Sequence, residues 1–538
     1  MKQAIALIAA FSITTAAALA APPQSAPRKS ESGSAPTGIF TSRQVKSSGT
    51  VTVEGHRIAY DAVAGTIIVH PKGWDDAAKP QGPKDAPGSA GGPPVASMFY
   101  VAYFKQGADA HTRPLTFLYN GGPGSSTIWL HMGAFGPVRV VTSNDSHTPP
   151  APYRTVDNAY SLLDASDLVF IDAPGTGFSR IEGKDKKQAF WGVDQDGNAF
   201  TSFITQFLSR YGRWNSPKYL FGESYGTPRS AVLINDLETG QDIDFNGVIL
   251  LSQVLNFNLM ADAPQGNPGV DLPYEIALPT YAATAWYHHK LGSQASDLES
   301  LLQEVEQFAM GDYANALAQG ANLPEDQFDA IARKLHDYTG LPVAYIKKAD
   351  LRVRGPEFSQ QLLNDSDLTT GRLDSRFSGP VMDPLAEDAS YDPQSAAISS
   401  AYVSAFNDYV RRDLHYTTQE AYYPEIDIWN IWQFKHQPPD APFQLAGAVN
   451  VMPDLAQAMK YDPNLKICLN GGYFDLATPF FQGMYEMHHL PIPQRLQSNI
   501  EYHYYQSGHM VYANETSLKQ IHDNVAAFIR RNASQAGE

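Results

Sequence analysis

The chain has 538 residues, of which 43% are hydrophobic and 11% aromatic, so it can bury the large core of a globular enzyme. Its 56 acidic side chains outnumber its 39 lysines and arginines, which gives a formal net charge of -17 at pH 7. An acidic chain without a basic run is not expected to bind nucleic acid or an anionic membrane surface.

The first residues, 1–21, have the pattern of a secretory signal peptide. A short basic start, Met1-Lys2, precedes an apolar stretch, and Ala18-Leu19-Ala20 fits the small-residue cleavage motif. Residues 22–50 are rich in Pro, Ser, Gly and Ala, and we expect them to form a disordered linker. No later apolar run is long enough to span a membrane. Together with the signal-peptide pattern, this predicts a mature protein that is soluble and exported.

Cys468 is the only cysteine, so the monomer cannot form an intramolecular disulfide. Secreted eukaryotic enzymes of this size usually contain several, and we therefore expect a periplasmic or extracellular enzyme of a bacterium. Cys468 lies in an apolar run, where a cysteine is expected to pack as a small core residue.

Short apolar runs alternate with helical patterns in residues 51–255. Apolar residues at helical spacing, such as Phe200, Phe203 and Phe207, predict helices between the apolar runs. Strands that alternate with helices imply a mainly parallel sheet. The expected strands lie at 51–60, 65–69, 98–104, 115–119, 168–171, 219–221 and 247–251.

Ser224 lies in the most informative stretch of the chain, residues 219–226. An apolar strand runs into the turn Gly-Glu-Ser-Tyr-Gly, and a helical pattern follows at once. This is the context of a nucleophile elbow, in which a serine occupies a sharp strand-to-helix turn. Gly222 and Gly226 stand where larger side chains would collide in the bend.

An oxyanion hole needs two backbone N–H groups directed at the developing negative charge. One is expected from Tyr225, the residue after the serine, and the other from a loop that follows an early strand. The loop Asn120 to Ser126 follows the strand predicted at 115–119, and its paired glycines let the backbone approach a ligand closely.

Residues 256–445 interrupt the alternation of strands and helices. We expect a mainly helical insertion that caps the active site, between core parts at 51–255 and 446–538. Two apolar stripes, expected to pack within this insertion, are Leu298, Leu301, Leu302, Val305 and Phe308, then Phe328, Ile331, Ala332 and Leu335.

Asp475 and His509 each follow an apolar or aromatic strand and a glycine turn near the end of the chain. Catalytic residues lie on loops at the carboxyl ends of parallel strands, and α/β-hydrolases carry nucleophile, acid and histidine in that chain order. We therefore predict an α/β-hydrolase fold, with a mainly parallel central sheet flanked by helices. Ser224 is the expected nucleophile, His509 the general base and then acid, and Asp475 the residue that fixes the imidazole tautomer. The alternatives are a turn role for Asp475 and a structural role for His509.

With these residues in place, the chain resembles the serine carboxypeptidase family. The resemblance covers most of the chain from about residue 95 to the end, except for a weakly matching middle part. It rests on segments that occur in the family's order: 120–126 (NGGPGSS), 135–137 (FGP), 170–179 (FIDAPGTGFS), 222–226 (GESYG), 470–475 (NGGYFD) and 508–511 (GHMV).

The resemblance implies specific roles near the serine. The N–H groups of Gly122 and Tyr225 would form the oxyanion hole, Asn120 and Glu223 would bind the C-terminal carboxylate of the substrate, and Met510 would contact the substrate. A glutamate can hydrogen-bond a carboxylate only if one of the two holds a proton, which suits acidic pH. Alternatively, Asn120 holds its own loop and Glu223 pairs within the fold.

The chain departs from the family's pattern at two positions. Ser125 stands where many members have a cysteine, so the disulfide of that loop is absent. Ala134 stands where many members have a second glutamate that binds the substrate carboxylate. The usual strict C-terminal specificity and acidic optimum are therefore less firmly implied.

The resemblance and the triad together predict a serine carboxypeptidase that acts on peptides with a free C-terminus through an acyl-enzyme. An esterase or acyltransferase could use the same triad, and a non-catalytic binding protein on a hydrolase scaffold is a further alternative. The oligomeric state is left open, a homodimer included.

No cofactor and no metal are expected. The adjacent histidines at 288–289 and 488–489 point apart and lack further ligands at zinc spacing. The glycine loop at 174–177, which follows Asp172, lacks the context of a nucleotide-binding motif.

Overall fold

The structure, a computed structural model, describes residues 40–75, 82–292, 297–447 and 449–534. The predicted signal peptide, residues 1–21, and the first part of the predicted linker lie outside these ranges. The described residues belong to one compact unit.

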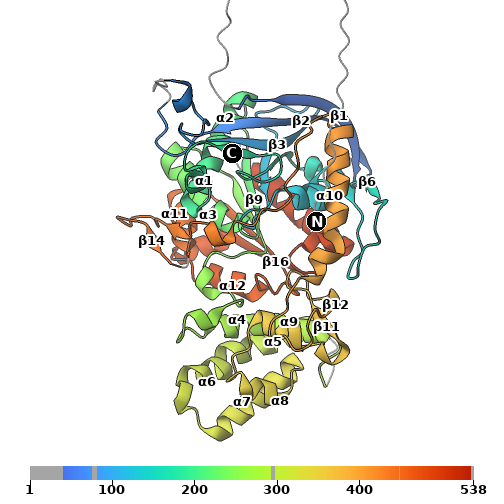
Figure 1. The fold of residues 1–538 in the computed structure, drawn as a ribbon, viewed down its shortest axis with the longest axis vertical. Helices are drawn as coiled ribbons and strands as arrows, with labels where there is room; N and C mark the ends of the chain where they lie inside the picture. Colours follow the sequence, from blue (N-terminus) through green and yellow to red (C-terminus); the bar gives the residue numbers. More distant parts are fainter. Residues whose placement is uncertain (1–39, 76–81, 293–296, 448, 535–538) are drawn as a thin grey trace, which may run out of the picture. The chain divides into compact units, whose positions relative to one another are not determined.

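A ten-stranded sheet lies at the centre of this unit (Figure 1). Its first three strands are antiparallel, whereas the six strands that follow them across the sheet run parallel to one another. β8 (Arg180–Glu182) pairs with β3 beside the main path. In spatial order the other strands are β1 (Gln44–Val53), β2 (His56–Val69), β3 (Val95–Lys105), β7 (Asp167–Ile171), β4 (Leu115–Tyr119), β9 (Lys218–Glu223), β10 (Gly247–Leu251), β15 (Lys466–Gly472) and β16 (Ile500–Tyr505).

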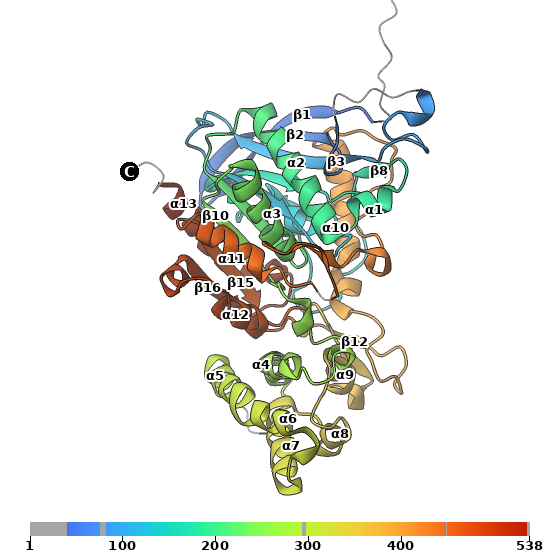
Figure 2. The ribbon, with the colours of Figure 1, turned by 90° about the vertical axis from the view of Figure 1, so that its left-hand side faces the viewer.

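Side chains alternate between the two faces of the sheet, and each face has its own apolar core. Phe117 and Leu220 pack with the helices of one face, whereas Leu118 and Phe221 pack with those of the other. Figure 2 shows the helices of the first face side by side. They are α2 (Val193–Tyr211), α3 (Gly226–Gln241) and α11 (Met452–Tyr461); the opposite face holds α10 (Pro393–Arg412) and α13 (Glu515–Ser534). This mainly parallel sheet between helices is an α/β-hydrolase fold, so the predicted fold class is confirmed.

The linker prediction is wrong for residues 44–50, which belong to β1. This strand lies at the edge of the sheet and, within the described ranges, pairs only with β2. Most of its side chains are wholly or partly exposed. The polar composition that suggested a linker is that of a solvated edge strand. The chain turns into β2 at Glu54 and Gly55, whose φ angles are 48° and 79°.

Between β10 and β15 lies the mainly helical segment predicted as an insertion. The two predicted stripes lie on α5 and α7, and both contribute to a separate apolar core. Leu259 and Leu298 of this segment also pack against Phe474 and Phe480, which follow β15. Its helices before α10 are α4 (Leu272–Tyr287), α5 (Leu298–Phe308), α6 (Ala314–Gln319), α7 (Glu325–Thr339), α8 (Val343–Lys348) and α9 (Gly355–Gln361). The role of the segment as a cap stays a prediction.

Smaller elements complete the described part of the chain. Within the described ranges, no helix is both long and apolar enough to cross a membrane. The remaining α-helices are α1 (Lys186–Phe190) and α12 (Phe480–His488). The remaining strands form the pairs β5 (Val138–Val140) with β6 (Thr155–Asp157), β11 (Leu368–Thr370) with β12 (Ser378–Pro380), and β13 (Lys435–His436) with β14 (Leu445–Ala446).

Candidate active site

Ser224 lies on a tight turn between β9 and α3. Its φ angle is 60°, in the left-handed region that residues other than glycine rarely adopt. The turn requires flanking glycines, because a Cβ at Gly222 would lie 2.1 Å from the carbonyl oxygen of Gly226. Ser224 itself is partly exposed, whereas its neighbours on both sides are buried. A strained, accessible serine between a strand and a helix has the geometry of a nucleophile elbow.

Asp475 and His509 form a hydrogen-bonded pair on loops that follow β15 and β16. His509 Nδ1 lies 2.7 Å from Asp475 Oδ2, and the two residues are only 4% and 0% exposed. β15 and β16 are parallel neighbours, so the loops beyond their carboxyl ends meet. Thr478 donates its N–H and its hydroxyl to the same carboxylate, at 3.0 and 2.7 Å. The carboxylate is thus held where it fixes Nδ1–H of the imidazole.

The charges around His509 favour its protonated form. Burial by itself lowers the pKa of His509, but Asp475 and, to a smaller extent, Glu223 outweigh burial and raise the pKa above its ordinary value. Arg372 opposes this rise. An imidazole that can take up a proton beside a carboxylate suits a general base.

The end of β10 connects the serine turn to the histidine loop. The N–H of Ser224 donates to the carbonyl oxygen of Leu251 at 3.0 Å. The next residue, Ser252, donates its hydroxyl to the carbonyl oxygen of His509 at 2.7 Å. The structure therefore anchors Ser224 and His509 to consecutive residues at the same edge of the sheet.

The loop after β4 lies directly against the serine turn. A Cβ at Gly121 would lie 2.3 Å from the backbone nitrogen of Tyr225, so only glycine permits this approach. Among the residues that the structure describes, neither the N–H of Gly122 nor that of Tyr225 donates a hydrogen bond. Unbonded amides beside an accessible serine are available to an oxyanion.

Arg229 on α3 holds this loop in place. Its Nη1 donates to the carbonyl oxygen of Asn120 at 2.7 Å, and its Nε binds Asp196 Oδ2 on α2 at 2.6 Å. The side chains of the ion pair are 0% and 2% exposed. A buried, hydrogen-bonded pair of this kind orients the loop backbone rather than the substrate.

Asn120 and Glu223 lie close together, and both are already hydrogen-bonded within the protein. Asn120 Oδ1 accepts from the N–H of Leu130 at 3.0 Å, and Tyr512 donates its hydroxyl to the two oxygens of Glu223 at 3.1 and 2.9 Å. Burial raises the pKa of Glu223 to about 7, against the opposing effects of His509 and of the hydrogen bonds from Tyr512 and Asn120. Glu223 is therefore largely protonated in mildly acidic solution, where it can donate a hydrogen bond.

Three other residues singled out in the sequence are buried. Met510 is 6% exposed and belongs to the apolar core on the α13 face of the sheet. Ala134 is 0% exposed in a π-helical turn, Leu130–Phe135. Ser125 accepts a hydrogen bond from Trp129 Nε1 at 2.8 Å, a side-chain contact within its own segment.

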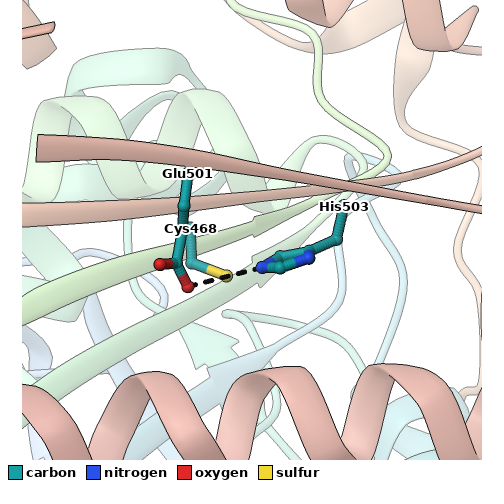
Figure 3. Close-up of side chains that lie close together, drawn as sticks. All are labelled: Cys468, Glu501 and His503. Carbon is teal, nitrogen blue, oxygen red and sulfur yellow. Dashed lines mark hydrogen bonds and ion pairs between the residues drawn. The ribbon is translucent and has the colours of Figure 1, made fainter. Parts of the chain in front are cut away.

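Cys468, Glu501 and His503 form the one cluster among the described residues whose ligand atoms, all within 4.8 Å of one another, could hold a metal (Figure 3). Glu501 is paired with Arg531 at 2.5 Å and lies 3.4 Å from His503 Nε2. Burial raises the pKa of the Cys468 thiol, and Glu501 raises it further. Only a thiolate binds a metal well, and the neighbouring arginine already neutralises the carboxylate, so the cluster is poorly suited to a cation.

A comparison with known protein families gives a match over residues 92–522, to the family described as serine carboxypeptidase. The chain belongs to the serine carboxypeptidase family. The match includes the serine turn, the loop after β4 and the loops that carry Asp475 and His509.

Individual relatives of the chain match over shorter stretches. Serine carboxypeptidase-like 33 of Arabidopsis thaliana is 28% identical over 180 residues, which cover 32% of this chain and 35% of that protein. The pheromone-processing carboxypeptidase KEX1 of Phytophthora infestans is 31% identical over 139 residues, which cover 24% and 21%. The match thus spans well under two thirds of either relative. A solved structure of KEX1, a prohormone-processing carboxypeptidase from Saccharomyces cerevisiae, aligns with 87% of this chain and 91% of that chain, with 15% identity and a TM-score of 0.47.

Sequence reasoning missed Thr478 and Tyr512, which contact two of the predicted site residues. Thr478 stands three positions after Asp475, a spacing typical of a side chain that bonds a preceding aspartate, so a local signal was present. Tyr512 contacts Glu223, which lies 289 positions earlier in the chain, and no local sequence pattern predicts such a contact. The residues 372–376, which contact both the Asp475 and the His509 loops, were also missed.

Proposed function

We propose that the protein is a serine carboxypeptidase that cleaves C-terminal peptide bonds through an acyl-enzyme on Ser224. The observation that carries this proposal is the buried His509–Asp475 pair, 2.7 Å apart, in which the His509 loop is anchored to the same end of β10 as the strained Ser224 turn. Membership of the family supports peptides as the substrate class.

The proposed chemistry assigns one role to each residue. Ser224 Oγ attacks the carbonyl carbon of the scissile bond while His509 Nε2 takes its proton, and Asp475 holds Nδ1–H and stabilises the imidazolium. The unbonded N–H groups of Gly122 and Tyr225 donate hydrogen bonds to the oxyanion of the tetrahedral intermediate. His509 then gives the proton to the leaving amine, and water attacks the acyl-enzyme by the reverse sequence of proton transfers.

The free C-terminus of the substrate is recognised by Asn120 and by the protonated form of Glu223. The role proposed for Met510, the residue after His509, is a contact with the substrate. A pKa of about 7 supports a protonated Glu223 in mildly acidic solution. Because Ala134 offers no second acid, preference for a free carboxylate over an amide is modest, about 1–3 kcal/mol. The structural alternative for Asn120 and Glu223 predicts equal rates on both kinds of substrate.

The proposal extends to location and to the helical segment. The signal-peptide pattern at 1–21 and the single cysteine support export to the periplasm or the medium of a bacterium. Contacts of residues 256–445 with the residues that follow β15 support a role for this segment as a cap over the active site.

The test uses the mature protein and blocked dipeptides with free and with amidated C-termini. The proposal predicts release of the C-terminal amino acid, faster from the free acid, and labelling of Ser224 by a fluorophosphonate. Turnover of esters without turnover of either peptide would instead indicate the esterase or acyltransferase alternative. Failure of Ser224 to react with the fluorophosphonate would indicate a non-catalytic binding protein.

A further inference from the structure

The turn between β11 and β12, residues 371–377, lies between the loops that carry Asp475 and His509. A hydrogen bond of 2.9 Å from the N–H of Gly371 to the carbonyl oxygen of Phe377 closes this turn. β11 and β12 belong to the mainly helical segment (Figure 1), so a part of the chain far from both loops in sequence reaches the candidate active site. We call residues 372–376 the hairpin tip.

The hairpin tip hydrogen-bonds to the backbone of both loops. The N–H of His509 donates to the carbonyl oxygen of Leu373 at 2.6 Å, and the N–H of Leu476 donates to that of Arg372 at 3.0 Å. These donors are His509 itself and the residue next to Asp475. Strand pairing of β15 with β16 ends at Gly472 and Tyr505, so the loops beyond it need other support.

A buried ion pair within the tip contacts the loop that carries His509. Arg376 binds Asp374 through two hydrogen bonds, of 3.0 and 2.6 Å, and the side chains are only 4% and 0% exposed. Asp374 Oδ2 accepts from the N–H of Gly508 at 3.2 Å, and Arg376 Nη2 donates to the Ser507 hydroxyl at 3.2 Å. A Cβ at Gly508 would lie 2.4 Å from the Cβ of Asp374, so the loop and the tip are in direct contact.

The tip is fixed from the helical side as well. Ser375 shares a hydrogen bond of 2.6 Å with the Thr284 hydroxyl on α4, and its carbonyl oxygen lies 2.6 Å from His288 Nε2. Its N–H donates to the carbonyl oxygen of Phe474 at 2.9 Å. Ser375 therefore connects α4 to the loop of Asp475 within a single residue.

We propose that the hairpin tip positions the proposed catalytic pair, with Asp374 and Arg376 holding the loop of His509 against the loop of Asp475. This inference rests on the proposed function, because it concerns the same triad. Among the described residues, the last direct backbone hydrogen bond between the two loops runs from the N–H of Phe474 to the carbonyl oxygen of Ser507. Beyond that point the tip accepts hydrogen bonds from backbone N–H groups of both loops. An error of about 1 Å in the resulting geometry can lower turnover about 100-fold.

The experiment compares Asp374→Asn and Arg376→Lys with a matched control pair in the full mature chain. The control pair, Arg213 and Asp167, is also a buried ion pair, with a contact of 2.6 Å and side chains 3% and 5% exposed. Asp167 begins β7, and Arg213 precedes β9, so this pair lies at the opposite, amino end of the parallel strands. Asp167→Asn should lower the unfolding temperature as Asp374→Asn does, but it should leave the site geometry unchanged.

The rate of fluorophosphonate labelling at Ser224 is the first measurement, because it reports on the triad without peptide binding. We expect Asp374→Asn to lower this rate and kcat about 10- to 100-fold, with KM changed less than about threefold. Arg376→Lys keeps the charge but loses the forked geometry, so its rates should fall between those of the wild type and Asp374→Asn. The control variant should be labelled at the wild-type rate.

The pH profile separates positioning from general destabilisation. The charged groups that act on His509 are Asp475, Glu223 and Arg372. The double variant Asp374→Asn/Arg376→Gln leaves the net charge unchanged, yet a looser contact with Asp475 should move the acidic limb of kcat/KM to lower pH. An unmoved limb together with wild-type labelling would overturn the proposal, as would an equal loss of labelling in the control.

Failure of this inference is distinguishable from failure of the proposed function. If the wild type itself is not labelled at Ser224, the proposed function is wrong. If the wild type reacts and Asp374→Asn reacts equally fast, only the positioning role is wrong. Should Asp374→Asn fail to fold, Ser507→Ala removes just the hydrogen bond from Arg376 and should slow labelling severalfold, whereas wild-type labelling of both Ser507→Ala and Arg376→Lys would refute the inference.

Discussion

Replacing Glu223 by glutamine should change the pH range of the enzyme at both ends. Burial raises the pKa of Glu223 to about 7, and Tyr512 holds both oxygens at 3.1 and 2.9 Å. Only the protonated acid can donate a hydrogen bond to a substrate carboxylate, and it is lost as the pH rises through 7. Glutamine keeps an oxygen for Tyr512 and supplies an N–H donor that needs no proton.

The size of the effect follows from the pKa. At pH 8 about one tenth of Glu223 would carry the proton, and at pH 9 about one hundredth. Wild-type kcat/KM should therefore fall about tenfold per pH unit above 7, until the carboxylate recognition of about 1–3 kcal/mol is lost. For Glu223→Gln it should stay within about threefold over the same range. On the acidic side, the negative charge of Glu223 raises the pKa of His509. Its removal should lower that pKa, so the acidic limb of the variant should lie at lower pH.

The assay measures kcat/KM from pH 4 to 9.5 for both proteins, on one blocked dipeptide as the free acid and as the amide. The amide is the matched control, because it has no carboxylate to receive the proton of Glu223, and the wild type should show no alkaline decline with it near pH 7. An alkaline decline at the same pH in both proteins on the free acid would refute the reasoning. Glu223 would then be a structural residue.

Three further predictions concern the triad and stability. Ser224→Ala and His509→Ala should each lower kcat about 10⁴- to 10⁶-fold with an unchanged unfolding temperature, and near-wild-type turnover in either would contradict the assignment. His436 lies 2.6 and 2.8 Å from two aspartates; burial by itself lowers the pKa of His436, but these contacts raise it from 6.5 to about 9. Its contribution of about 3 kcal/mol to the free energy of unfolding is complete below pH 6.5 and is lost as the pH rises through 9, so urea titrations of His436→Gln should lack this pH dependence. Because Cys468 is the only cysteine, dithiothreitol should not shift Tm by more than about 1 °C, and a larger shift would indicate an intermolecular disulfide.

The central strands could be predicted because both of their faces are buried. Runs such as 115–119 and 247–251 are apolar at consecutive positions and end in turn residues, and both form strands within those bounds. The edge strand β1 has no such run, because solvent covers much of it and the polar residues that result resemble a linker. The central strands could be predicted from the sequence because both of their faces are buried, rather than because of strand propensity.

The residues of the candidate site likewise fall into those that local sequence patterns predict and those that they do not. Local sequence patterns indicate Ser224, Asp475 and His509, because each follows an apolar or aromatic strand and a turn that contains glycine. Tyr512 and the hairpin tip contact the site through the fold of distant segments, and their own sequences carry no sign of it. Residues that reach the site only through tertiary contacts therefore cannot be predicted from local sequence patterns.

Glu223 and His509 are coupled in a way that limits activity at every pH. The proposed reaction needs a protonated Glu223 and a neutral His509, yet the same single proton can instead leave Glu223 charged beside a protonated His509. Each group acts on the pKa of the other, and both pKa values are raised. These two arrangements hold the same number of protons, so a change in pH alters their combined population but not the ratio between them. The acidic and alkaline limbs of the pH–rate profile therefore report on the pair and not on either residue alone. Only a change in the surroundings can alter that ratio. Glu223→Gln removes the unproductive arrangement altogether, which is why its optimum should be broader and not merely displaced.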